Sequence, residues 1–146
     1  DPSTWLHWTT DGIGFAGVRI QRPSASSAYQ GTIQMQGNAT DAARQGFITN
    51  TESLTDIQQI IVVLRANSAT ALNVSIFMGD KPADAADYEG MEVTPTSNTS
   101  VKDDASGQYV HTVSYEFAGN KYPYFKLVNK TRAAFYAESI TVVYKK

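Results

Sequence analysis

The chain shows its clearest strand pattern in Leu72-Asn73-Val74-Ser75-Ile76-Phe77-Met78. The apolar residues at the even positions share one parity, which is the period of a β-strand with one face toward a core. Gly79 and Asp80 follow directly and end the strand, because both residue types favour turns. The segment therefore predicts a β-strand.

The same period recurs along most of the chain. Residues 60–64, Ile-Ile-Val-Val-Leu, are apolar on both parities and predict a central strand covered on both faces. The other candidate strands cover residues 17–20, 32–36, 46–49, 109–117, 124–128 and 140–144. Together these segments predict about eight strands.

Helical patterns are short and confined to two places. Residues 40–44 predict one turn, capped by Thr40 or Asp41 and ended by Gly46, and residues 82–87 predict another. The long loops cover residues 21–30 and 79–107, and a short strand is predicted within the second at Met91-Glu92-Val93. Strands joined by loops without core helices pair in antiparallel fashion.

We therefore expect residues 1–146 to form a single all-β domain, an antiparallel jelly-roll or Greek-key β-sandwich with at most one or two short helical turns. A closed barrel is the alternative, and residues 60–64 favour the sandwich because a small barrel strand usually has one wet face. The expected core takes the apolar parity of the five best strands. Its members are Ile60, Val62, Leu64, Val74, Ile76, Val113, Phe117, Leu127, Ile140 and Val142.

The composition excludes several classes of protein. The chain has 146 residues, 42% of them hydrophobic and 18% charged, as in folded domains. Its net charge of -2 argues against a nucleic-acid partner. The longest apolar stretch is far shorter than the ~20 residues of a membrane span, so we expect no membrane insertion by this segment. The absence of cysteine excludes a disulfide scaffold and a thiol nucleophile.

Four N-x-S/T sequences occur, at Asn38, Asn73, Asn98 and Asn129. They carry glycan only in a eukaryotic secretory pathway, and Asn73 falls inside a predicted strand. In a chain rich in serine and threonine we interpret them as chance.

The residues that catalysis requires are scarce. Of the two histidines, His111 shares the apolar parity of its strand and is expected to be a hydrogen-bonded, buried residue, whereas His7 is expected at the surface. No nucleophile elbow, zinc-protease motif or phosphate-binding loop is present. We therefore expect that the domain is not an enzyme.

Aspartates gather in the 79–107 loop, at Asp80, Asp84 and Asp87. Calcium takes six to eight oxygen ligands, which such a loop can supply, but the spacing matches no EF-hand. The principal interpretation is a solvated turn, so no cofactor and no metal site is expected, and calcium is kept as a minor possibility.

Aromatic residues outside the predicted core indicate a binding function. Rings in loops can stack on the apolar faces of sugars, while neighbouring polar groups bond the hydroxyls. The candidate ligand-binding residues are Trp5, Trp8, Tyr88 and Tyr122, with polar help from Asp87, Asn120 and Arg132. The alternative for Trp5 and Trp8 is that they cap an open end of the sandwich.

The order of elements from residue 56 onward resembles the galactose-binding-like jelly roll of discoidin-type domains and many carbohydrate-binding modules. The segments that carry the likeness include Tyr124-Phe125-Lys126-Leu127-Val128 and the terminal Glu138-Ser139-Ile140-Thr141-Val142-Val143-Tyr144. Residues 31–38 and 45–51 look like modules of large secreted proteins from Bacteroides-type gut bacteria. This resemblance implies an extracellular location, non-catalytic binding and often a structural calcium.

Two functional hypotheses follow. The first is an extracellular or bacterial cell-surface module that binds a glycan or another cell-surface ligand without catalysis. The alternative is a structural or adhesin-like module of a larger surface protein, with no small-molecule site. In both hypotheses the partners include other domains of a larger chain.

Overall fold

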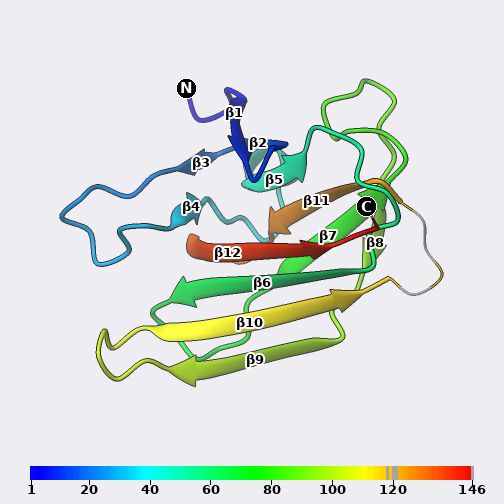
Figure 1. The fold of residues 1–146 in the computed structure, drawn as a ribbon. Coiled ribbons are helices and arrows are strands. Elements are labelled where there is room, and N and C mark those ends of the chain that lie inside the picture. Colours follow the sequence, from blue (N-terminus) through cyan, green and yellow to red (C-terminus); the bar gives the residue numbers. More distant parts are fainter. Residues whose placement is uncertain (118, 120–121, 146) are drawn as a thin grey trace.

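Two antiparallel sheets of six strands each make up the fold (Figure 1). The computed structural model describes residues 1–117, 119 and 122–145. Sheet A has the order β1 (Leu6–Thr10), β2 (Ile13–Val18), β5 (Phe47–Asn50), β11 (Tyr124–Asn129), β7 (Val74–Gly79) and β8 (Met91–Val93). Sheet B has the order β3 (Ile20–Gln21), β4 (Ile33–Met35), β12 (Phe135–Val143), β6 (Gln59–Ala66), β10 (Tyr109–Glu116) and β9 (Ser97–Lys102).

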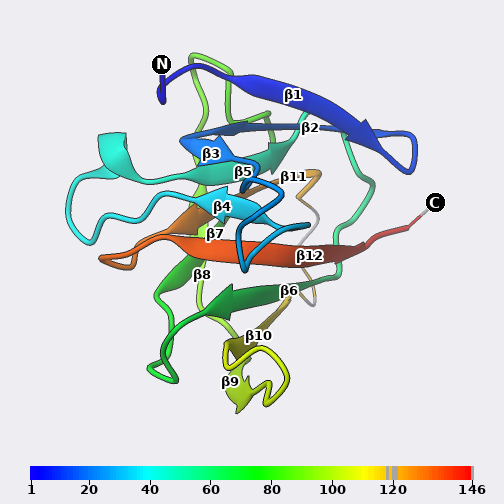
Figure 2. The ribbon, with the colours of Figure 1, turned by 90° about the vertical axis from the view of Figure 1, so that its left-hand side faces the viewer.

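Eight of these strands follow jelly-roll topology. The eight are β4 to β8 and β10 to β12, and they can be counted from first to eighth along the chain. In sheet B the order β4-β12-β6-β10 is then first, eighth, third, sixth. In sheet A the order β5-β11-β7-β8 is second, seventh, fourth, fifth, and the two orders together define a jelly roll. The predicted jelly-roll sandwich of about eight strands is therefore confirmed. The remaining strands, β1 and β2 in sheet A and β3 and β9 in sheet B, extend the edges (Figure 2).

The core lies between the two sheets and contains most of the predicted residues. Ile76 and Leu127 of sheet A and Val62, Leu64 and Val113 of sheet B are fully buried. The Tyr115 hydroxyl crosses the sandwich and donates a hydrogen bond of 2.7 Å to the Val74 carbonyl. Ile140 and Val142 are only half-buried, because β4 pairs with β12 only as far as Ala137 and leaves the rest of that edge open.

The expectation that residues 60–64 are covered on both faces is wrong. Along β6, Ile60, Val62 and Leu64 are buried, while Ile61 and Val63 on the outer face are half-buried. These two residues lie beside Ser114 and Thr112 of β10, so the outer face of sheet B is polar and partly wet. The prediction of a sandwich was thus correct, but the reason given for preferring it to a barrel, full cover of residues 60–64 on both faces, was not.

The short elements fit the sequence signals unevenly. Ala42–Arg44 form one 3-10 turn (η1), and Asp41 caps it by accepting a hydrogen bond of 3.0 Å from the Ala43 amide. Residues 82–87 form turns instead of a helix, with the Ala85 amide bonded to the Pro82 carbonyl. In the described residues, no helix is long and apolar enough to cross a membrane.

One of the N-x-S/T asparagines lies outside the strand predicted for it, and another is buried. Asn73 is exposed and precedes β7. Asn129 is fully buried at the end of β11, where its amide nitrogen donates to the Met35 carbonyl at 2.9 Å and the Ala133 carbonyl at 3.1 Å. Because Met35 belongs to β4, this side chain ties sheet A to sheet B.

Candidate functional site

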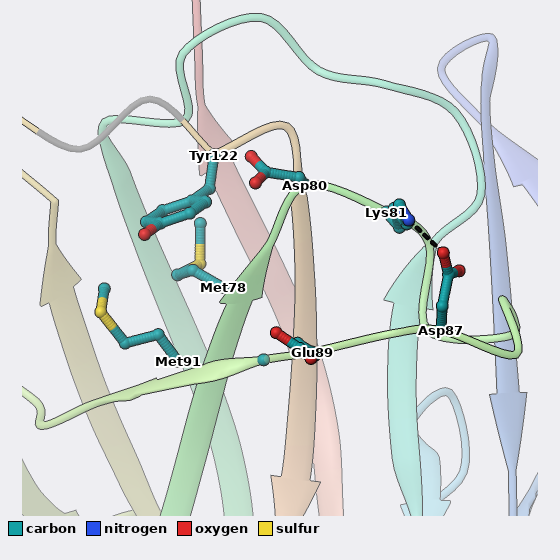
Figure 3. A pocket seen from close by; sticks show the side chains of 8 residues that line it. Met78, Asp80, Lys81, Asp87, Glu89, Met91 and Tyr122 are labelled. Carbon is teal, nitrogen blue, oxygen red and sulfur yellow. Dashed lines mark hydrogen bonds and ion pairs between the residues drawn. The ribbon is translucent and has the colours of Figure 1, made fainter.

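A cavity of about 540 Å³ opens at the end of sheet A, where β7 leaves the sheet and β8 returns (Figure 3). We call it the loop-end cavity. Its lining comes from the β7–β8 connection and from the approach to β11. The lining residues are Met78, Asp80, Lys81, Asp87, Glu89, Gly90, Met91 and Tyr122. The volume falls within the range of roughly 300–1,000 Å³ usual for small-molecule sites.

The local sequence explains how the loop leaves this space. Gly79 ends β7, and a side chain there would meet the Glu89 carbonyl at 2.9 Å. Gly90 lies under the Tyr88 ring, and a side chain at this position would meet the Tyr88 hydroxyl and the Phe77 Cβ atom. The two glycines therefore let the returning chain pack closely on β7, which brings Asp80, Asp87 and Glu89 around one opening.

Carboxylates dominate the charge of the loop-end cavity. Lys81 and Asp87 form an ion pair, whose hydrogen bond raises the pKa of Lys81 and lowers that of Asp87. Figure 3 shows this pair along the loop, with Tyr122 and Asp80 close to each other and Glu89 apart from both. With three carboxylates and one ammonium group, the lining is net negative.

The chemistry available in the cavity is hydrogen-bond acceptance beside apolar surface. The carboxylates of Asp80 and Glu89 can accept bonds from hydroxyl groups. The Tyr122 ring and the Met91 side chain, which is 44% exposed, supply apolar contact surface. In the part of the chain that the structure describes, no three acidic, histidine or cysteine side chains gather as a metal centre requires, and Asp84 does not line the cavity.

A second hollow of about 320 Å³ lies on the outer face of sheet A, and we call it the sheet-face groove. Side chains of β5, β7 and β11 and the segment around η1 surround it. The lining residues are Ala39, Thr40, Ala42, Gln45, Phe47, Phe77, Lys126, Val128 and Lys130.

Two lysines of the sheet-face groove differ in their partners. Lys130 forms an ion pair of 2.8 Å with Glu92 and lies 5.0 Å from the Phe77 ring centroid. Lys126 lies 4.3 Å from the Phe47 ring centroid and 5.9 Å from that of Tyr88. Burial lowers the pKa of Lys126. Among the described residues, no carboxylate is within 4.0 Å of its ammonium group.

The sequence-predicted site residues fall into different places. Tyr122 and Asp87 line the loop-end cavity. Trp5 and Tyr88 flank the sheet-face groove, since Trp5 packs edge-on at 5.2 Å against Phe47 and Tyr88 lies near Lys126. The Tyr88 hydroxyl is buried without a hydrogen-bond partner among the described residues, and burial raises its pKa to about 12.

The other predicted residues are not part of either hollow. Trp8 stacks on Phe15 at 6.1 Å and packs against the core, so it does not share a platform with Trp5. Arg132 follows β11, whereas Tyr122 precedes it, and a strand of 6 residues separates them by roughly 20 Å. Asn120 lies outside the described residues.

Sequence reasoning missed the groove residues Phe47, Phe77 and Lys126. One signal was available, because Phe77 stands on the polar parity of its strand and so points away from the core. The position of η1 beside the sheet carries no comparable signal.

His111 is buried as predicted, with its Nε2 atom 2.8 Å from the Ser68 carbonyl.

Comparisons with family models, with curated proteins and with solved structures gave no match for this chain.

Proposed function

We propose that this domain is a non-catalytic module of an extracellular or bacterial cell surface that binds uncharged glycans at the loop-end cavity. The observation that carries the proposal is a cavity of about 540 Å³ in which the Tyr122 ring lies close to the Asp80 carboxylate, with Glu89 farther along the same lining (Figure 3). The likeness of the sequence to galactose-binding-like modules supports the same class of ligand.

The lining suits a sugar better than an apolar ligand. A sugar ring has an apolar face of C–H groups and a periphery of hydroxyls, and these match an aromatic ring beside hydrogen-bond acceptors. The net negative charge repels anionic ligands, which restricts the cavity to uncharged or cationic sugars. We assign Tyr122 to contact with the ring face and Asp80 and Glu89 to hydroxyl recognition.

The cavity is open to solvent, so a bound sugar would bury few of its atoms. Affinity for a single sugar is therefore expected to be no better than about millimolar. Several modules in a larger chain would raise the overall avidity without new contacts.

The test combines a glycan array with titration of the best uncharged ligand, followed by NMR amide shifts. Tyr122→Leu keeps an apolar residue against the core, and it should weaken binding at least tenfold because the ring is lost. Asp80→Asn should also weaken binding, whereas Asp84→Asn is the matched control, since Asp84 is an exposed aspartate of the same loop outside the cavity.

Unchanged affinity in both Tyr122→Leu and Asp80→Asn would contradict the assignment of the cavity. If no array ligand shifts any resonance of the β7–β8 loop, the proposal fails and the structural or adhesin-like module becomes the better account.

A further inference from the structure

We propose that the sheet-face groove is a second, separate binding site, which takes a carboxylate-bearing sugar of an acidic glycan with Lys126 as the charge partner. The groove lies on the outer face of β5, β11 and β7, and the assignment does not depend on the loop-end cavity.

Lys126 is held in place by the centre of sheet A. Its backbone is paired with Thr49 of β5 on one side and with Phe77 of β7 on the other. The side chain is half-buried, with its ammonium group 4.3 Å from the Phe47 ring centroid. A cation whose stem is fixed in this way loses little conformational freedom when it meets an anion.

The charge of Lys126 is uncompensated within the described part of the chain. Glu92 neutralises the neighbouring Lys130, but no carboxylate reaches Lys126 within 4.0 Å. A half-buried cation gains more from an opposite charge than an exposed lysine does, because solvent screens the pair less. A ligand carboxylate is the complement that this position lacks.

The remainder of the lining favours a sugar acid over a simple anion. Phe47, Phe77 and Val128 give apolar surface, and Trp5 extends it by its contact with Phe47. Thr40 adds a hydroxyl, and Gln45 lines the groove with its side-chain nitrogen already donated to the Asn38 carbonyl at 2.8 Å. A uronic acid presents C–H groups, hydroxyls and one carboxylate within a single ring, so it can use all three kinds of contact.

A peptide is a poorer match for the groove. Peptides that bind sheets add as a strand to a free edge and use backbone hydrogen bonds. β11 is paired with β5 on one side and with β7 on the other, so its backbone groups are already used in the ladder. The groove lies on the face of the sheet, where only side chains are offered.

The experiment follows backbone amide shifts during titration with D-glucuronic acid, D-glucose and acetate at equal concentrations. Glucuronic acid should shift the amides of Thr40, Gln45 and Lys126, while glucose and acetate should shift them far less. Lys126→Met should weaken glucuronate binding at least tenfold, and Lys126→Arg should retain it. Lys102→Met is the matched control, since it removes the same charge from an exposed position on β9.

Several outcomes would overturn the assignment. Acetate shifts as large as those of glucuronic acid would reduce the site to a carboxylate contact, and the absence of groove shifts in the wild-type protein would remove the site without any variant. Equal loss in Lys102→Met and Lys126→Met would indicate a general charge effect. Tyr122→Leu should leave glucuronate binding unchanged. A negative result for the loop-end cavity can therefore be distinguished from a negative result for the sheet-face groove.

Discussion

At the scale of the residue, Asn129 joins the two sheets with one amide. Its nitrogen serves the carbonyls of Met35 and Ala133, and its oxygen accepts the Thr131 amide at 2.9 Å. Every polar atom of this buried side chain is therefore bonded. Burying a polar group of this kind costs little free energy only while all of its hydrogen-bond partners remain in place.

Asn129→Ala should lower the free energy of unfolding by about 1–3 kcal/mol, because it removes the Asn129 donor from the Met35 carbonyl and the acceptor of the Thr131 amide. Asn73→Ala is the control, since Asn73 is exposed and its replacement should change stability by no more than about 0.5 kcal/mol. Urea denaturation of both variants measures the difference. Equal effects at the two positions would show that Asn129 does not join the sheets.

The Glu92–Lys130 pair gives the domain a dependence on acid. The hydrogen bond from Lys130 and, less strongly, that from Ser75 lower the pKa of Glu92. The lowered pKa means that ionised Glu92 stabilises the fold at pH values above its pKa in the unfolded chain, which is about 4.3. This stabilisation is lost as the pH falls through the lower pKa that Glu92 has in the folded protein. Glu92 is 43% exposed, so the contribution is expected to be no more than about 1 kcal/mol.

Glu92→Gln should therefore be less stable than the wild type at pH 7, and the difference should shrink as the pH falls to 3. Chemical denaturation of both proteins at the two pH values provides the measurement. A difference that persists unchanged at pH 3 would assign the effect of the substitution to packing instead of charge.

At the scale of the element, the two faces of a strand differ in what they contribute. Ile76 of β7 is fully buried between the sheets, whereas Ile61 of β6 lies on the half-buried outer face of sheet B. Ile76→Ala should cost about 2–5 kcal/mol, the usual range for a buried isoleucine. Ile61→Ala makes the same chemical change and should cost less than about 1.5 kcal/mol, because folding removes less apolar surface from water at this half-buried position.

Thermal and urea unfolding of the pair test this contrast directly. A loss below about 1 kcal/mol for Ile76→Ala would place β7 at a wet edge, against its position between β11 and β8.

Strands were predictable where apolar and polar residues alternate along the sequence. β10 alternates because it buries one face, and it was found. β7 was found from its alternating sequence, although Ser75 on its outer face is buried as well. β9 was missed because all six of its residues are exposed, which leaves no hydrophobic period to detect. β1 was missed for a similar reason, since Trp8 alone of its residues is half-buried.

The candidate sites were predictable only in part. Tyr122 and Asp87 stand in loops, where an aromatic or an acidic residue is conspicuous, and both line the loop-end cavity. Lys126 and Phe47 belong to strands, and their meeting depends on the pairing of β11 with β5. Pairing between strands so distant in the chain is a property of the topology, which no local pattern contains.

At the scale of the whole molecule, one core serves both sheets. Tyr115 of sheet B bonds Val74 of sheet A, and Asn129 of sheet A bonds Met35 of sheet B. Links in both directions couple the sheets, so neither is expected to unfold without the other.

Urea unfolding followed by tryptophan emission and by far-ultraviolet circular dichroism should therefore give coincident transitions. Trp5 and Trp8 report on the β1 edge of sheet A, while circular dichroism reports on all strands. A tryptophan transition at lower urea would show that the β1–β2 hairpin separates first and that the domain is not a single cooperative unit.

The jelly-roll order also governs when the protein can fold during its synthesis. The last two strands to be made occupy interior places, with β11 between β5 and β7 and β12 between β4 and β6. Until they leave the ribosome, β5 and β7 have no common neighbour, and the nascent chain cannot complete either layer. Folding is thus delayed until translation of the domain is nearly finished. Ribosome-bound chains arrested before β12 should remain sensitive to protease, and protection at that length would refute the delay.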